Sequence, residues 1–428
     1  MKNRSTGVAL GVDVGTSGCR VVALDRHGAV VAEARASFPE PEGEAGRREQ
    51  NPEIWWRAVA DSLARVAAEL AGTPVAALAV DGTSGTLLLA DETGRPLTPG
   101  LLYHDCRAVA EARRIAAVAP PESGAHGATS ALAKLLHLLP EVRGRARHAL
   151  HQADWIAGRL AGHWGVSDEN NALKLGYDPR VRAWQEWLEK LGVPLEWLPR
   201  VVAPGTPVGR LSPEAVRRTG LPAETVVVAG TTDSVAAVLA TGVEATGDAV
   251  TALGSTLALK VWADTPVFAP RYGVYSHRLG DRWLVGGASN SGGAVLLRHF
   301  SREALARLTS DLCPERPTGL DYYPLAAPGE RFPVADPAWP PRLEPHPGDP
   351  VVFLQGMLEG IAAIERDGYR RLAELGAPYP RRVVTTGGGA VNEAWRRIRE
   401  RLLEVPVERA THQEAAYGAA LLAAGGVR

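Results

Sequence analysis

Asp233 is the single charged residue in the segment from Val226 to Gly242, which is otherwise built of apolar and small residues. A carboxylate inside such a segment is costly to bury unless it is paired, hydrogen-bonded or used in chemistry. Because Asp233 follows Gly-Thr-Thr and precedes an apolar helical pattern, one role is that of a helix N-cap. Thr231 or Thr232 would cap the helix equally well, which leaves the carboxylate of Asp233 able to act as a general base.

Three turns rich in glycine, serine and threonine each follow an apolar segment of the chain. Such turns can present several backbone N–H groups to one anion, and their small residues let a phosphate approach the backbone closely. A single turn of this composition is explained equally well by tight packing, whereas three turns in both halves of the chain favour a phosphate-rich ligand. The candidate phosphate-binding residues are Thr16 and Ser17 in the first turn, Gly254, Ser255 and Thr256 in the second, and Gly388 and Gly389 in the third.

Asp13 lies two residues before Gly15, where the first turn begins. A carboxylate beside bound phosphates would repel them unless a cation lay between, and Mg²⁺ that keeps several waters supplies such a cation. The sequence therefore indicates a magnesium ion held near Asp13. The alternative is that Asp13 only caps the turn.

The elements that must hold these residues follow from the pattern of apolar residues. Residues 8–14, 19–25 and 29–36 predict three consecutive strands, and the turn after Asp13 joins the first two. Residues 51–70 have the periodicity of an amphipathic helix, with Asn51 as its cap and a proline at its first position.

The second half of the chain repeats much of this plan. Strands followed by polar or glycine-rich turns, and then by strands or helices, are predicted at residues 225–242, 248–264 and 381–403, with an alanine-rich helix at 412–426. The repetition predicts an α/β protein of two related lobes that face each other across a central cleft. We expect the lobes to comprise residues 1–222, with the sugar and the first phosphate turn, and residues 223–428, with the nucleotide and the base.

Composition narrows the class of protein. The chain of 428 residues is longer than one compact core usually supports, which also favours two domains. A formal net charge of −1 argues against a nucleic-acid-binding protein. Three widely spaced cysteines predict no disulfide framework, and no apolar segment reaches membrane-spanning length. We expect a cytoplasmic protein with no nucleic-acid or membrane partner, either a monomer or a homodimer.

The segments GVDVGTSGCRVVALD, GTTDS, TALGSTLAL, TTGGGAVNEAWRRIRERLLEVPV and EAAYGAALLA follow one another along nearly the whole chain. In kind and order they resemble the motifs of the FGGY carbohydrate kinases, members of the actin-like ATPase superfamily. The last two segments are the most specific of the set. The resemblance implies two ribonuclease-H-like α/β lobes and a carbohydrate kinase that uses ATP and Mg²⁺.

The resemblance also implies a role for each matched residue. Asp13 and Thr16 are expected to handle the magnesium ion and the phosphates, and Asp233 is expected to accept the proton of the sugar hydroxyl. Gly254 and Thr256 match a second phosphate-binding turn. The residues expected to flank the nucleotide are Gly388, Gly389 and Asn392.

Two further segments are candidates for binding the sugar, beside Asp13 and Asp233. LLYHDCRA resembles a family segment in which an aspartate and an arginine follow a strand, so Asp105 is expected to bind the sugar, with a surface turn as the alternative. VDGTSGT stands where xylulose and glycerol kinases carry a glutamine-bearing segment, so Ser84 is expected to donate to a sugar hydroxyl instead. The lone histidine His104 is expected to be structural.

The chain is shorter than typical family members, and its Gly-Thr-Ser motif resembles that of short ribulose or xylulose kinase-like proteins. The expected acceptor is therefore a pentulose, D-ribulose ahead of D-xylulose. Two alternatives remain open at this stage. One is a kinase of another polyol such as glycerol, and the other is a nucleotide-dependent sugar-binding regulator with little catalysis.

Overall fold

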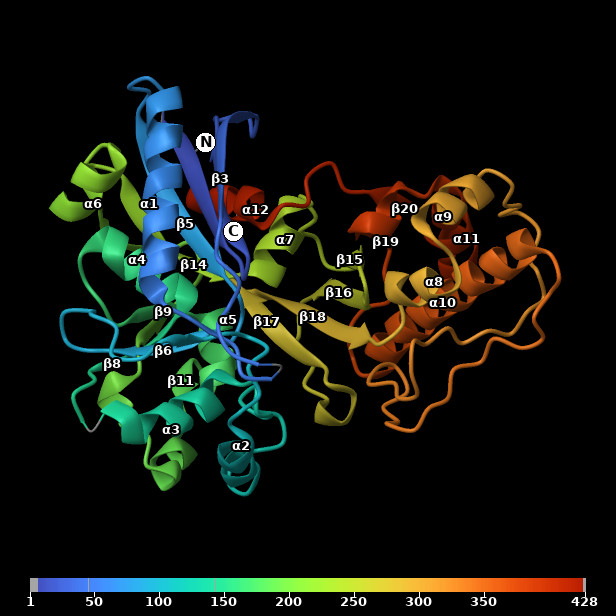
Figure 1. Cartoon of the computed structure of the whole chain (residues 1–428), viewed down its shortest axis with the longest axis horizontal. Helices are drawn as coiled ribbons and strands as arrows, with labels where there is room; N and C mark the ends of the chain where they lie inside the picture. Colours follow the sequence, from blue (N-terminus) through green and yellow to red (C-terminus); the bar gives the residue numbers. More distant parts are fainter. Residues whose placement is uncertain (1–6, 45, 143, 426–428) are drawn as a thin grey trace. The chain divides into compact units, whose positions relative to one another are not determined.

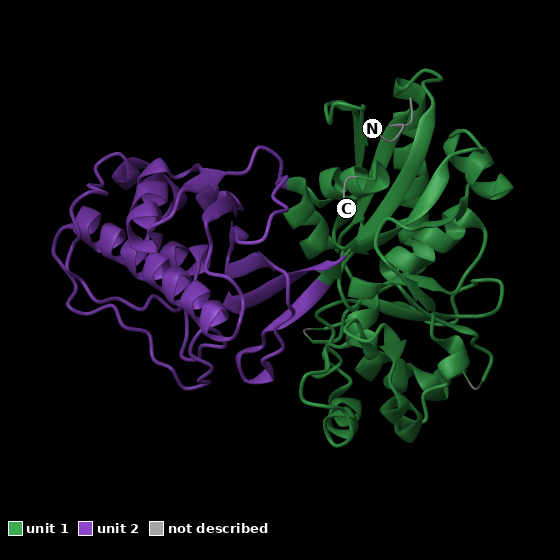
Figure 2. Ribbon diagram, turned by 180° about the vertical axis from the view of Figure 1, so that it is seen from behind, with its two compact units in different colours: residues 1–240, 278–280, 414–428 green, residues 241–277, 281–413 purple. Residues whose placement is uncertain are grey.

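The computed structural model describes residues 7–44, 46–142 and 144–425, which form two compact units (Figure 2). The first unit comprises the chain up to Ala240, the short segment Arg278–Gly280 and the chain from Glu414 onward. The second unit comprises Thr241–His277 and Asp281–Gln413.

The first unit is built on a six-stranded sheet whose central strands are apolar over most of their length. β1 pairs antiparallel with β2, and β2 with β3, which confirms the three predicted strands (Figure 1). β5 and β14 extend the sheet in parallel on the other side of β1. In spatial order the strands are β13 (Pro207–Arg210), β14 (Val226–Thr232), β5 (Val75–Gly82), β1 (Val8–Val14), β2 (Gly18–Leu24) and β3 (Val30–Ser37).

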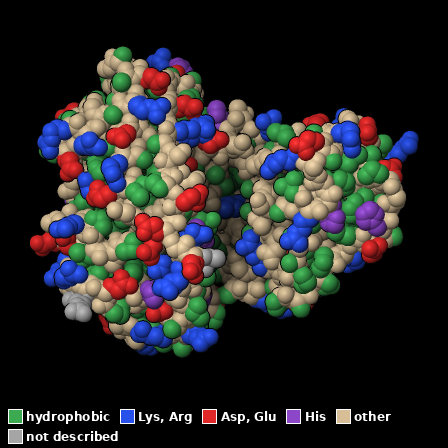
Figure 3. Space-filling view, in the orientation of Figure 1, with side chains coloured by type: hydrophobic (Ala, Val, Ile, Leu, Met, Phe, Trp, Pro, Cys, Tyr) green, Lys and Arg blue, Asp and Glu red, His purple; other side chains and the backbone are tan. Residues whose placement is uncertain are grey.

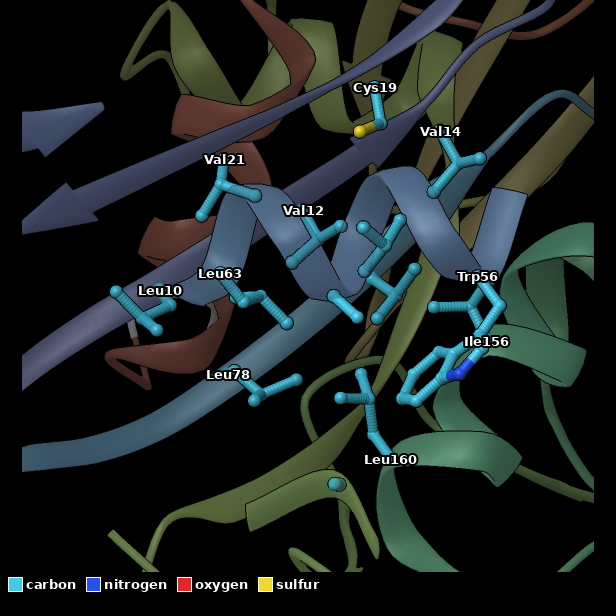
Figure 4. Close-up of a cluster of buried hydrophobic side chains, with 14 of the residues drawn as sticks. Leu10, Val12, Val14, Cys19, Val21, Trp56, Leu63, Leu78, Ile156 and Leu160 are labelled. Atoms are coloured by element: carbon cyan, nitrogen blue, oxygen red, sulfur yellow. The ribbon is translucent and has the colours of Figure 1, made fainter. Parts of the chain in front are cut away.

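Helices cover both faces of this sheet, which explains why its central strands lack an apolar–polar alternation. Helix α1 (Pro52–Glu69) packs on the face that carries Val21, and Asn51 caps it as predicted by accepting the N–H of Glu53. Figure 4 shows Leu63 of α1 among the side chains of β1, β2 and β5. On the opposite face, α12 (Ala415–Ala423) packs against Val22.

Gly11 of β1 explains how closely α12 approaches the sheet. A Cβ atom at this position would lie 1.9 Å from the carbonyl oxygen of Ala416 and 2.3 Å from the amide nitrogen of Ala420. On the other side of α12, a Cβ atom at Gly418 would lie 1.8 Å from the carbonyl oxygen of Ala236 in α7 (Asp233–Ala240). The alanine- and glycine-rich composition of the last helix therefore reflects close packing against both β1 and α7.

The turn after β5 leads the chain into a second, four-stranded sheet of the first unit. Its strands, in spatial order, are β4 (Glu49–Gln50), β7 (Gly100–Leu101), β6 (Leu87–Ala90) and β8 (His148–His151). The helices of the rest of this unit are α2 (Val109–Ala116), α3 (Ala131–Val142), α4 (Gln152–Ala161), α5 (Glu169–Ala172) and α6 (Pro213–Thr219), with 3-10 helices at Leu173–Leu175, Glu186–Leu191 and Leu195–Trp197. Two-stranded ladders join β9 (Val166–Asp168) to β12 (Arg200–Val202) and β10 (Tyr177–Asp178) to β11 (Ala183–Trp184).

The second unit has a six-stranded sheet of its own. In spatial order its strands are β17 (Tyr275–Leu279), β18 (Arg282–Ser289), β16 (Leu257–Ala263), β15 (Asp248–Leu253), β19 (Arg382–Thr386) and β20 (Val407–Arg409). The helices are α8 (Gly293–His299), α9 (Arg302–Thr309), α10 (Pro350–Glu374) and α11 (Glu393–Leu403), with 3-10 helices at Pro270–Tyr272 and Gly388–Val391. The predicted β15–β16 hairpin and the strand, glycine loop and helix at 381–403 are both present.

A buried ion pair holds the strands of the second unit in place. The guanidinium of Arg399 in α11 donates to both carboxylate oxygens of Glu365 in α10, at 2.6 and 2.7 Å. Arg399 also donates to the hydroxyl of Thr385 in β19, and Glu365 accepts the hydroxyl of Thr251 in β15. Since the two glycine-rich turns of this unit follow β15 and β19, the ion pair fixes the strand ends that carry them.

The two units divide at a different place from the boundary expected near residue 222. β14 pairs with β5 in the first sheet, and α7 packs against α12, so the chain leaves the first unit only after Ala240. Asp233, at the start of α7, therefore belongs to the first unit together with Asp13 and not to the second.

The surface carries charges of both signs. Figure 3 shows lysine and arginine side chains interspersed with aspartate and glutamate on the face in view, without a uniformly basic area. Within the described ranges, no helix has the length and hydrophobicity that crossing a membrane requires.

Candidate active site

The first phosphate-turn candidate is the connection between β1 and β2. The N–H of Gly15 donates to the carbonyl of Gly18 at 2.9 Å and closes the turn. Gly18 has no room for a side chain, because a Cβ atom there would lie 2.4 Å from the carbonyl oxygen of Ala36 in β3. Thr16 is half-buried and Ser17 is exposed. In the part of the chain that the structure describes, the amide N–H groups of Thr16 and Ser17 donate to no protein acceptor.

Asp13 faces a second carboxyl group, that of Asp81, across the β1–β5 ladder. The two residues are directly paired in the register of these parallel strands, and Asp81 is completely buried. Neither carboxylate oxygen of Asp81 has a hydrogen-bond donor among the described residues. Two carboxyl groups so placed can share a hydrogen bond only if one of them carries a proton.

Burial is the main reason why both carboxyl groups hold protons more tightly than usual. Burial, opposed by a hydrogen bond with Asp81 and supported by the neighbouring charge of Asp233, raises the pKa of Asp13 to about 6. Burial also raises the pKa of Asp81 well above its usual range, and the charges of Asp13 and Asp233 act in the same direction. The three carboxyl groups are therefore close enough to interact electrostatically, at one edge of the first sheet.

Asp233 is the first residue of α7 and is half-buried. Its Oδ1 accepts the N–H of Ser234 at 2.6 Å, so its charge lies at the positive end of the helix dipole. Asp233 therefore lies at the start of the helix, as a helix cap would, and it also lies close enough to Asp13 and Asp81 to interact with their charges. The two roles are compatible, because a carboxylate has several lone pairs to offer.

The chemistry of these groups fits a hard cation such as Mg²⁺. Carboxylate oxygens are the ligands that Mg²⁺ prefers. Among the residues described, no three histidine, cysteine or acidic side chains are arranged to hold a metal by themselves. A magnesium ion here would therefore rely on one or two carboxylates together with water and phosphate oxygens, as Mg²⁺ commonly does.

Ser84 lies in the turn that connects β5 to β6, and two lysines hold the backbone of this turn. The ammonium group of Lys174 donates a hydrogen bond to the carbonyl of Ser84 at 3.4 Å. The ammonium group of Lys134 donates one to the carbonyl of Gly85 at 2.7 Å. Lys134 is fully buried and also donates to the carbonyl of Leu102 at 2.7 Å. The hydroxyl of Ser84 is half-exposed on a turn whose backbone position is thus fixed.

Asp105 is neither a surface residue nor open to a ligand in this conformation. Its side chain is completely buried, and its oxygens accept hydrogen bonds from Arg107 and from the N–H of Arg48. Although burial opposes it, the bonds from Arg107 hold the pKa of Asp105 below its usual range. The carboxylate of Asp105 fixes the positions of Arg48 and Arg107. This geometry does not support a direct contact between Asp105 and a sugar.

His104, expected to be structural, lines a cavity beside the first turn. The cavity has a volume of ≈ 200 Å³ and is lined by Thr16, Ser17, Phe38, Pro39, Glu40, Pro41, Arg48 and His104. The Nδ1 atom of His104 is buried without a hydrogen-bond partner among the described residues. Burial and the charge of Arg48 lower the pKa of His104 and so favour the neutral ring. A hydroxyl group in the cavity would complete its hydrogen bonding.

In the second unit, the turn Gly254–Thr256 joins β15 to β16 and is exposed. The N-terminus of α8 is tied to it, because the N–H of Gly293 donates to the carbonyl of Gly254 and that of Ala294 to the carbonyl of Ser255. Gly292 has a φ of +146°, and a Cβ atom there would lie 2.7 Å from the backbone of Thr256. These glycines were not among the sequence candidates, although SNSGGAVLL has the same composition as the predicted turns.

The third turn leads from β19 into α11. Gly387 has a φ of +84°, and a Cβ atom there would lie 2.6 Å from the carbonyl oxygen of Leu253, so the third turn packs on the end of β15. Asn392 caps α11 by accepting the N–H of Trp395 at 2.9 Å, and its amide donates to Thr309 at 3.3 Å. A nucleotide contact by Asn392 stays a prediction.

Two family models together match nearly the whole chain. The N-terminal domain of the FGGY family of carbohydrate kinases matches residues 8–240, and the C-terminal domain matches residues 226–426. The chain belongs to the FGGY family of carbohydrate kinases. The predicted fold, an α/β protein of two actin-like ATPase lobes, is confirmed, and the protein is a carbohydrate kinase.

The relatives of this FGGY kinase span most of its length at low identity. A xylulose kinase of Bacillus subtilis is 25% identical over 97% of this chain and 88% of its own. A gluconokinase of the same organism is 24% identical over 94% of this chain and 84% of its own. The solved structure of a xyloylose kinase from Brucella ovis superposes with a TM-score of 0.89 at 24% identity, covering 98% of this chain and 91% of that one.

Sequence reasoning missed Asp81 among the residues of this FGGY kinase that lie together at the sheet edge. A signal for it existed, since Asp81-Gly-Thr-Ser-Gly resembles Asp13-Val-Gly-Thr-Ser-Gly. The parallel pairing that sets the two aspartates opposite one another joins strands far apart in the chain, and only the fold reveals it.

Proposed function

We propose that this kinase transfers the γ-phosphoryl group of ATP to a hydroxyl of a pentulose, D-ribulose ahead of D-xylulose. The observation that carries the proposal is the group of three carboxyl residues, Asp13, Asp81 and Asp233, beside a turn with uncommitted amide N–H groups. Phosphoryl transfer needs donors for the phosphate oxygens, a counter-ion for their charge and an acceptor for the proton of the attacking hydroxyl.

In the proposed mechanism, Asp233 orients the sugar hydroxyl and accepts its proton. Because the transition state of phosphoryl transfer is loose, the proton leaves late, and a positioned base contributes about 10²–10⁴-fold to the rate. The amide groups of Thr16 and Ser17 would donate to oxygens of the transferred group. Gly254–Thr256 and Gly388–Asn392 would bind the nucleotide.

Mg²⁺ is the cation proposed for this site, where it would neutralise charge on the phosphate oxygens. Asp13 is the residue proposed to hold it, since its half-buried carboxyl lies closest in sequence to the phosphate turn. Asp81 is paired with Asp13 across the β1–β5 ladder, and its complete burial suits a supporting role better than direct contact with substrate. Ser84 and His104 are proposed to recognise hydroxyl groups of the acceptor.

The proposal is tested by coupled ADP release from ATP and Mg²⁺ against a panel of pentuloses, pentoses, hexuloses, aldonates and polyols. We expect one pentulose to stimulate ADP release and Asp233→Ala to abolish that stimulation while the protein stays folded. Asp61→Asn, at an exposed position of α1 in the same unit, is the matched control and should behave as wild type.

Other outcomes of this panel would favour the alternatives. Stimulation by glycerol or another polyol alone would keep the kinase and change its acceptor. Equal ADP release with and without every sugar would contradict the proposal and favour a nucleotide-dependent regulator. Full sugar-dependent activity in Asp233→Ala would reduce Asp233 to a helix cap.

A further inference from the structure

Two glutamine side chains donate hydrogen bonds to carbonyl groups of the first phosphate turn. Gln50, the last residue of β4, donates from Nε2 to the carbonyl of Thr16 at 3.0 Å. Gln152, the first residue of α4, donates from Nε2 to the carbonyl of Gly15 at 3.4 Å. Both side chains are buried, with exposed fractions of 2% and 0%. Consecutive carbonyl groups of the turn are therefore held by amide donors that come from distant parts of the chain.

Because the peptide bond is planar, a hydrogen bond that fixes a carbonyl group also fixes the direction of the N–H group in the same peptide unit. In a trans peptide, the C=O and the N–H point in opposite directions. The carbonyl of Gly15 shares its peptide unit with the N–H of Thr16, and the carbonyl of Thr16 shares its unit with the N–H of Ser17. Each of these N–H groups therefore points away from the glutamine that holds its peptide unit, and the described protein offers neither of them an acceptor.

The two glutamine amides are themselves oriented by groups that can only donate. The indole N–H of Trp55 donates to Oε1 of Gln50 at 2.8 Å, and Trp55 is completely buried. The backbone N–H of Thr83 donates to Oε1 of Gln152 at 3.1 Å. Because these donors select the oxygen of each amide, the NH₂ end is the one directed at the turn.

We propose that Gln50 and Gln152 are positioning residues of phosphoryl transfer, which hold two carbonyl groups back so that the N–H groups of Thr16 and Ser17 face the transferred phosphoryl group. The inference rests on the proposed phosphate-binding role of this turn. Gln152 also joins the turn to Thr83 in the segment of Ser84, so it links the phosphate turn to the proposed acceptor turn.

Substitution by glutamate tests this role with little change of shape. Gln50→Glu keeps an oxygen for Trp55 and loses the donor to Thr16, and Gln152→Glu keeps an oxygen for Thr83 and loses the donor to Gly15. Since removing one preorganised donor to developing charge costs about 10²–10³-fold in kcat, misorienting one should cost about 10-fold in Gln50→Glu. The effect of Gln152→Glu should be smaller, because its hydrogen bond is longer. KM for ATP should rise, and KM for the acceptor should change little in Gln50→Glu.

The pH dependence separates positioning from simple destabilisation. A glutamate that becomes protonated regains an O–H donor, so the kcat of each variant relative to wild type should recover as the pH falls from 8 toward 5. Gln355→Glu in the second unit is the matched control, because Gln355 is also buried and also donates to backbone carbonyls, those of Cys313 and Arg316. It should lower the Tm and leave kcat unchanged.

Contrary results are distinct from a failure of the proposed function. If no sugar stimulates ADP release by the wild type, the function itself is wrong. If the wild type is active and both variants keep its kcat, or lose activity without any recovery at low pH, the positioning role is wrong. Should Gln50→Glu fail to fold, as its Tm and circular dichroism would reveal, Gln152→Glu decides the test by the same two readouts.

Discussion

Two requirements oppose each other at Asp13. Its carboxyl group must be charged to hold a cation, but charging a buried carboxyl group costs free energy. Burial raises the pKa of Asp13 to about 6, and the nearby Asp233 adds to the effect. Asp81 lies beside it across the β1–β5 ladder, and burial raises the pKa of Asp81 well above its usual range. The proton of this pair and the proposed magnesium ion therefore compete for the same negative charge.

This competition predicts how activity depends on pH and Mg²⁺. Below pH of about 6, Asp13 binds a proton and loses its charge, so kcat/KM should fall on the acid side. Since Mg²⁺ binds only the ionised form, raising its concentration tenfold should move the acid limb to lower pH. Profiles of kcat/KM against pH at two Mg²⁺ concentrations would measure this. An acid limb that stays at the same pH at both concentrations would contradict the role given to Asp13.

At the scale of elements, sequence prediction succeeds where the signal is local. The β1–β2–β3 strands, the Asn51 cap of α1 and the β15–β16 hairpin were all predicted, because turn residues and periodicity lie within each segment. The placement of β14 beside β5 was not predicted, and with it the unit to which Asp233 belongs. The sequence of one strand alone does not indicate which distant strand it pairs with in parallel.

The packing of α12 on β1 at Gly11 leads to a prediction about stability. Because a Cβ atom there would collide with the backbone of α12, Gly11→Ala should push the helix away from β1 and cost about 1–3 kcal/mol or more. Gly348→Ala is the control, since a Cβ atom at that position meets no other group. Differential scanning calorimetry of both variants would measure the effect. An unchanged Tm in Gly11→Ala would show that α12 is not packed as described.

At the scale of the whole molecule, motifs alone predicted the family and the α/β class, and the family match extends over both units. The same motifs predicted site roles for Asp13, the glycine-rich turns and Asp233, and these roles stay predictions. They could not identify Gln50 and Gln152, which belong to no motif and contact the turn only after folding. Nor could they show that Asp105 is buried or that Nδ1 of His104 lacks a hydrogen-bond partner among the described residues, because both depend on neighbours that no single segment contains.

Transfer to a sugar hydroxyl, with Asp233 as the base, is the central claim. Phosphorus NMR of a reaction containing ATP, Mg²⁺ and D-ribulose, with wild type and Asp233→Asn in parallel, tests it most directly because it identifies the product. The wild type should yield ADP and a sugar phosphate monoester, and Asp233→Asn should form the monoester about 10²–10⁴-fold more slowly. ADP with inorganic phosphate in place of the monoester, or an equal rate of monoester formation in the variant, would contradict the account.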